Sequence, residues 1–106
     1  MLTIENTHTL INQRLTIPTG NYYVYNIWMW TQQGNEQYHL HIRHVNKTHS
    51  DIRLVLNRFK TRFASGYDGY ILWDEDTDRK CMLLSYEQIK DKNTFIYCIE
   101  RVMSIE

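Results

Sequence analysis

The sequence predicts an α+β domain in which a mostly antiparallel sheet of about five to six strands packs against one main amphipathic helix. Short runs rich in Val, Ile, Tyr and Trp recur along the chain and end at polar or glycine-containing turns, which is typical of strands. One stretch repeats apolar residues at three- and four-residue steps, as a helix does. The 106 residues are enough for one hydrophobic core, so we expect a single domain over residues 1–106.

The first half of the chain contains three predicted strands. Residues 10–17 form a short edge strand that closes on a Pro-Thr-Gly turn. Residues 21–31 carry aromatic and β-branched residues at successive positions, which indicates a central strand covered at least partly on both faces. A polar turn follows, and residues 36–45 return as a second long strand. These two long strands are therefore predicted to form a hairpin.

The main helix is predicted over about residues 49–65. Thr48 and Asp51 are spaced as helix-capping residues. The apolar residues that follow at helical spacing form one stripe, with basic residues on the remaining surface. The members of the stripe are Ile52, Val55, Leu56, Phe59 and Phe63. Gly66 stands where such a helix would end.

The second half of the chain alternates again between strands and turns. Residues 69–73 and 80–85 are predicted strands, and the acidic turn 74–78 joins them. Ser85 and Gln88 are spaced as a capping pair, which predicts a short helical turn over about 86–91. Residues 94–103 are rich in aromatic and branched residues and are predicted to close the sheet as its last strand.

Overall composition excludes several classes of protein. The formal net charge is zero, so no global attraction to nucleic acid or to a membrane is expected. No apolar run reaches the length of a membrane span, so we expect no membrane partner. The first residues lack the pattern of a signal peptide, and both cysteines lie within apolar runs. We therefore expect a cytoplasmic protein with reduced, buried cysteines.

Charge is nevertheless separated along the chain. Residues 36–65 carry six basic and two acidic side chains, whereas residues 66–78 carry five acidic side chains and no basic one. Either segment is a candidate binding surface or an ordinary solvated surface. The basic candidates are Arg43, Arg53, Arg58, Lys60 and Arg62, four of them on the predicted helix, where they could contact a nucleic-acid backbone. The acidic candidates are Asp74, Glu75, Asp76 and Asp78.

Aromatic residues are unusually concentrated in the predicted strand 21–31. Tyr23, Tyr25, Trp28 and Trp30 are the candidates for a surface role, because a single strand cannot easily bury all of its aromatic residues. Exposed Tyr and Trp are typical of protein interfaces, and they can also stack on nucleic-acid bases. The alternative is a thick core that buries them.

Two histidines, His39 and His41, are two residues apart on the predicted strand 36–45 and therefore share one face. Two neutral imidazoles can bind one divalent cation. A complete site would need a third ligand from His44, His49 or the acidic turn. The alternative is a polar strand face in contact with water.

The run from Gly34 to Ile42 (GNEQYHLHI) resembles motif 2 of the HUH endonucleases, which include rolling-circle replication initiators. The resemblance implies a divalent metal held by His39 and His41. It also implies that Tyr86 attacks a DNA phosphate and that Lys90 is the electrostatic partner of this tyrosine. A chain of this kind would be a metal-dependent enzyme that acts on single-stranded nucleic acid.

The residues as a whole favour a binding protein over an enzyme, because no complete catalytic set is visible in the sequence. We expect a small non-catalytic protein without a cofactor that acts through contacts with another protein. A phage-type or immunity-type inhibitor or adaptor of a larger, nucleic-acid-processing factor would have this character. The alternatives are the HUH-like enzyme with a divalent metal and plain nucleic-acid binding by the basic helix.

Overall fold

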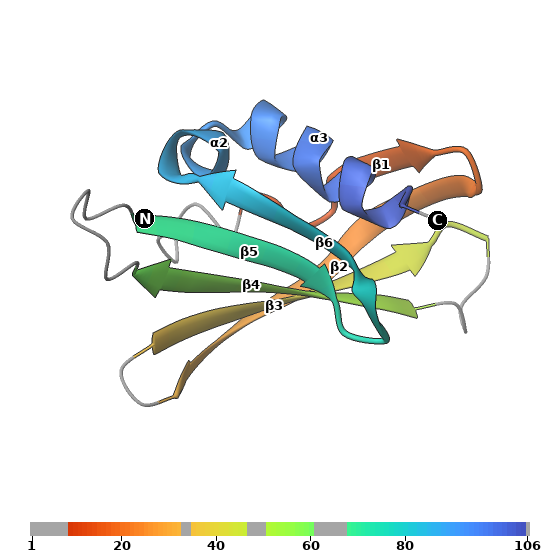
Figure 1. The fold of residues 1–106 in the computed structure, drawn as a ribbon. Helices are drawn as coiled ribbons and strands as arrows, with labels where there is room; N and C mark the ends of the chain where they lie inside the picture. Colours follow the sequence, from red (N-terminus) through yellow and green to blue (C-terminus); the bar gives the residue numbers. More distant parts are fainter. Residues whose placement is uncertain (1–8, 33–34, 47–50, 61–67, 106) are drawn as a thin grey trace.

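A computed structural model describes residues 9–32, 35–46, 51–60 and 68–105. Within these ranges six strands form one antiparallel sheet, and each strand pairs with the next one in sequence. The strands are β1 (Arg14–Ile17), β2 (Gly20–Gln32), β3 (Asn35–His44), β4 (Asp51–Lys60), β5 (Asp68–Asp74) and β6 (Thr77–Ser85). Helices α2 (Tyr86–Lys90) and α3 (Lys92–Met103) follow. The sheet is curled, and α3 lies on its inner face with contacts to β1, β5 and β6 (Figure 1).

The two faces of the sheet have different side chains. Every second residue of the strands points toward the helices. Most of these side chains are apolar and buried, and they share one core with the apolar stripe of α3. The opposite face is called the open face below, because no described helix covers it (Figure 1). By strand register and alternation its central members are Tyr23, Tyr25, Trp28, Trp30, His39, His41, Arg43, Arg53, Val55, Asn57, Ile71, Trp73, Cys81 and Leu83.

The α+β class, with an antiparallel sheet of six strands, confirms the fold predicted from the sequence. The hairpin of the two long strands, the short edge strand and the pair of strands around the acidic turn are all present. The short helix over residues 86–90 begins with the predicted capping pair. The hydroxyl of Ser85 accepts a hydrogen bond from the backbone of Gln88, whose side chain in turn accepts one from the backbone of Ser85.

The main helix predicted over 49–65 was wrong, because residues 51–60 form strand β4. Leu54 and Leu56 alternate with exposed Arg53 and half-buried Asn57, and both leucines are fully buried in the core. Val55 made the pattern look helical because it is buried too, although it lies on the open face. Its strand neighbours His39 and Trp73 flank it on both sides, and only 2% of Val55 is exposed. A strand buried on both faces can thus imitate a helical stripe.

The prediction of a last strand over 94–103 was also wrong, because these residues belong to helix α3. Its buried residues recur at three- and four-residue steps: Phe95, Cys98, Ile99, Val102 and Met103. The aromatic and branched residues favoured a strand, but the spacing of the apolar residues decides the structure. Asp91 caps the helix by accepting a hydrogen bond from the backbone of Thr94 at 3.2 Å.

The sequence also predicted that no segment spans a membrane and that both cysteines are buried. None of the described helices is long and apolar enough to cross a membrane. The two cysteines are free, and Cys98 is buried in the core as expected. Cys81 is exposed, because it lies on the open face of β6.

Candidate binding site on the open face

A β-bulge in β2 decides which aromatic side chains reach the open face. Val24 pairs with Ile42 of β3. The next residue of β3, His41, pairs with Asn26 and not with Tyr25, so Tyr25 is the extra residue of the bulge. Before the bulge the even-numbered residues of β2 point to the core, and after it the odd-numbered ones do. Trp28 and Trp30 are therefore turned onto the open face. An uninterrupted strand would have placed both indoles on the core side.

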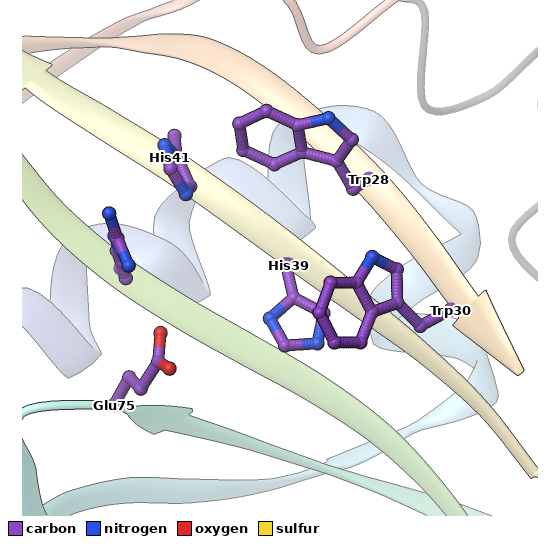
Figure 2. Close-up of a pocket in the computed structure, with 6 residues that line it drawn as sticks. Trp28, Trp30, His39, His41 and Glu75 are labelled. Carbon is purple, nitrogen blue, oxygen red and sulfur yellow. The ribbon is translucent and has the colours of Figure 1, made fainter. Parts of the chain in front are cut away.

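The two tryptophans form one side of a hollow of about 290 Å³ in the open face. Its lining residues are Trp28, Trp30, His39, His41, Arg53 and Glu75. The indole of Trp28 is 4.1 Å from the imidazole of His41, and that of Trp30 is 4.9 Å from the imidazole of His39, measured between ring centres. Figure 2 shows these ring pairs on β2 and β3, with Glu75 on the far side of β4. The hollow thus has an aromatic side and a charged side.

The charged side of the hollow carries one cation and one anion. Arg53 and Glu75 are held next to each other because the backbone N–H of Glu75 donates to the backbone carbonyl of Arg53 at 2.8 Å. In the described part of the chain neither side chain forms an ion pair. Both charged groups are therefore available to a bound molecule, and their charges balance.

His41 serves the hollow as a neutral ring. Burial lowers the pKa of His41, and the positive charge of Arg53 lowers it further. The Nε2 atom of His39 is shielded from solvent and has no hydrogen-bond partner within the described residues. This enclosed nitrogen of His39 is not open to a ligand that enters from solvent. Both imidazoles contact the indoles, with the His41 ring at 75° to Trp28 and the His39 ring tilted by 39° against Trp30.

Comparison of this chain with family models, with curated proteins and with solved structures finds no match.

A metal at His39 and His41 would need a third ligand, and the sequence suggested the acidic turn as one source. The structure does bring Glu75 of that turn to the same hollow. However, the described residues contain no group of three or more His, Cys, Asp or Glu side chains that could hold a metal ion. Arg53 also lines this space, and its positive charge opposes a cation there.

Tyr86 and Lys90 are not brought together with the histidines. Both belong to α2, which packs on the core face of β5 and β6 through Ile89. His39 and His41 point to the opposite face of the sheet, and the helices lie behind the sheet when the hollow is viewed from the front (Figure 2). The sheet thus separates the two halves of the HUH-like arrangement.

The basic residues do not form one surface, because the predicted helix that would have aligned them is a strand. Arg43 and Arg53 point to the open face, whereas Arg58 is on the core face of β4 and is half-buried. Arg43 is held by Asp51 at 3.1 Å, and its guanidinium lies 3.9 Å from the centre of the Tyr25 ring. Arg62 lies outside the described residues, and the description of Lys60 covers its backbone only.

The acidic residues also separate. Asp74 is buried, and its carboxylate accepts a hydrogen bond from the backbone of Asp76, which holds the turn in shape. Glu75 joins the hollow, and Asp76 is exposed to solvent. Asp78 is described by its backbone only. Of the acidic set, Glu75 is therefore the one that the structure places in a site.

The open face has members that the sequence-based list of candidates omitted. Trp73 lies in the same row across the sheet as Trp28 and His39, and Leu83 is 69% exposed on β6. Side chains alternate between the two faces of a strand. Alternation along the predicted strand 69–73 places Ile71 and Trp73 on one face, and alternation along 80–85 assigns Leu83 to a face in the same way. This alternation was the signal that could have identified the omitted residues.

Proposed function

We propose that this chain is a non-catalytic binding protein whose open face docks on a partner protein and whose hollow receives one side chain of that partner. The observation that carries the proposal is the gathering of exposed aromatic side chains around the hollow. Trp30 is 63% exposed, and Trp28, Tyr25 and Leu83 are exposed on the same face. Large apolar side chains gathered on one face are characteristic of interaction sites. An inhibitor or adaptor that acts by covering part of a larger factor has these properties.

The balance of charge supports a protein partner over a polyanion. The open face carries the ion pair of Arg43 with Asp51 and the opposite charges of Arg53 and Glu75. A phosphate chain is bound by an excess of positive charge. A protein surface instead offers both signs of charge, and tryptophan and arginine are the residues most enriched in the centres of protein interfaces.

The test is capture of a partner by the immobilised chain from an extract of the source cells. Replacement Trp30→Ala removes the most exposed indole of the hollow and should weaken capture at least about tenfold, the size of a typical interface hot spot. Tyr97→Ala is the matched control, because Tyr97 is a 56% exposed aromatic residue on α3, on the other side of the sheet. A partner retained equally by Trp30→Ala and by the wild type would contradict the proposal.

Single-stranded nucleic acid is a second candidate partner, supported by Arg53 beside the exposed indoles and by Arg43 over the exposed Tyr25 ring. Bases stack on aromatic side chains while cations contact the phosphates. Fluorescence anisotropy with a labelled oligonucleotide distinguishes the two candidates. Binding that falls steeply with salt and weakens in Arg53→Ala would favour nucleic acid. Covalent attachment of the oligonucleotide in the presence of manganese, lost in Tyr86→Phe, would instead support the HUH-like enzyme.

A further inference from the structure

Strand β2 is much longer than the edge strand that covers it. β1 pairs with Gly20–Tyr23 at the start of β2. The pairing continues for one more residue, because Val24 exchanges backbone hydrogen bonds with Asn12 and Gln13. Beyond Val24, no strand of the described residues pairs with the outer edge of β2 over residues 25–32. This stretch is called the free edge below.

The register shows which backbone groups of the free edge point outward. Both backbone groups of Val24 point away from β3, and its partner on β3 is Ile42. Val24 and Ile42 are thus a non-hydrogen-bonded pair, and such pairs recur at every second residue of β3. The β2 partners of Leu40, Tyr38 and Glu36 therefore also direct their backbone groups outward. Those partners are Ile27, Met29 and Thr31.

The hydrogen bonding of Ile27 agrees with this assignment. Its backbone N–H donates to the side-chain oxygen of Asn26 at 2.9 Å, so a neighbouring side chain occupies a donor that a paired strand would use. Unpaired edges are usually protected by charged side chains, by proline or by bulges. Residues 25–32 contain no charged residue and no proline, and the bulge lies at their beginning. Among the described residues, nothing therefore prevents another strand from pairing with the free edge.

We propose that the free edge pairs with the same edge of a second copy of this chain, antiparallel and with Met29 at the two-fold axis. Met29 would then exchange both backbone hydrogen bonds with Met29 of the second copy. Ile27 would pair with Thr31 of the second copy, and by symmetry Thr31 would pair with Ile27 of the second copy. The two sheets would become one continuous sheet.

The side chains favour a second copy as the occupant. In this register Trp28 lies directly opposite Trp30 of the second copy, on the open face, and Trp30 lies opposite its Trp28. Both are non-hydrogen-bonded pairs, in which cross-strand side chains come closest and aromatic pairs are most stabilising. No like charges meet in the pairing, and the zero net charge of the chain adds no repulsion between copies.

The dimer would form whether or not a partner occupies the hollow. Dimerisation would place two open faces side by side, so that a partner with two equivalent sites could bind both hollows. Met29→Pro changes the dimer edge and leaves all six lining residues of the hollow in place. The two proposals can therefore fail separately.

Sedimentation velocity over a concentration series tests the dimer with the full chain. The wild type should form a dimer, and Met29→Pro should weaken it at least about tenfold, because proline removes an outward N–H that β3 does not use. Met29→Ala is the matched control: it shortens the same side chain and keeps the N–H, so its effect should be clearly smaller. A wild type that stays monomeric up to about 1 mM overturns the inference. So does a dimer that Met29→Pro leaves unchanged.

Disulfide trapping tests the register without depending on the proline variant. In a Cys81→Ser background, Met29→Cys should form a disulfide-linked dimer on mild oxidation. The reason is that the Cα atoms of a hydrogen-bonded antiparallel pair lie about 5.5 Å apart, which a disulfide can span. Thr31→Cys is the control, because the two Thr31 positions would be about 13 Å apart in this register. Equal cross-linking of both variants, or none of Met29→Cys, contradicts the proposed pairing.

Discussion

The imidazole of His41 lies between an indole and a guanidinium, and both neighbours affect its chemistry. Burial is the larger cause of its lowered pKa, and the charge of Arg53 is the next. A protonated His41 would place a second positive charge next to Arg53. Near neutral pH the ring is therefore a neutral partner for Trp28, and Arg53 is the cation that remains available to a ligand.

This arrangement predicts that Arg53→Gln raises the pKa of His41, although burial should keep it below the ordinary value of 6.5. Arg53→Lys keeps the charge and should keep the lowered pKa. The unfolded chain takes up this proton as the pH falls through about 6.5, before the folded chain does. The stability that His41 contributes is therefore full above that pH and is lost as the pH falls through the folded pKa. NMR titration of the His41 ring measures the shift, and an unchanged pKa in Arg53→Gln would show that burial alone acts.

At the scale of single elements, β4 shows how one pattern can fit two structures. The helical interpretation used Ile52, Val55 and Leu56 and left Leu54 outside the stripe. In the structure Leu54 is fully buried between β3 and β5, where it pairs with Leu40 and Asp74. The side-chain burial of Leu54 is therefore the feature that distinguishes the strand from the helix.

Leu54→Ala should lower the free energy of unfolding by about 2–5 kcal/mol, because it leaves a cavity in a fully buried site. Arg53→Ala changes an exposed neighbour on the other face and should alter the free energy of unfolding by less than about 0.5 kcal/mol. Chemical denaturation of both variants measures the two values. A small effect of Leu54→Ala would contradict the strand and favour the helical stripe.

At the scale of the whole molecule, α3 links the two ends of the curled sheet. Besides its apolar contacts with β1, β5 and β6, the carboxylate of Glu100 accepts a hydrogen bond from the backbone N–H of Thr16 at 2.7 Å. The C-terminal helix thus satisfies a donor on the N-terminal edge strand. This contact joins residues 84 positions apart in sequence.

Glu100→Ala should therefore loosen β1 against the helix. We expect faster amide hydrogen exchange at Thr16 and a loss of about 1 kcal/mol in the free energy of unfolding, the size of one partly exposed hydrogen bond. Arg101→Ala is the control, because the guanidinium of this exposed neighbour lies over the Tyr97 ring of the same helix. Unchanged exchange at Thr16 in Glu100→Ala would show that packing alone holds β1.

Some of the candidate site could be predicted from local sequence. His39 and His41 share a face because strand side chains alternate, and this is a property of the backbone alone. The surplus of aromatic residues in β2 indicated that some of them would be exposed, and Trp28 and Trp30 are. The hairpin of β2 and β3 and the capped turn at Ser85 depend on nearby residues, so the sequence identified them correctly.

The remaining features depend on contacts between distant residues. The bulge at Tyr25 turned both tryptophans to the open face, and the chain contains no local signal for it. Pairing with β3 and β5 made residues 51–60 a strand, although their apolar spacing also fits a helix. The sequence alone determined the α+β class, the strand hairpins and the shared face of the histidines, because short-range geometry decides them. Only the tertiary structure decided that Glu75 and Arg53 join the tryptophans, because sheet register brings together residues that the sequence keeps apart.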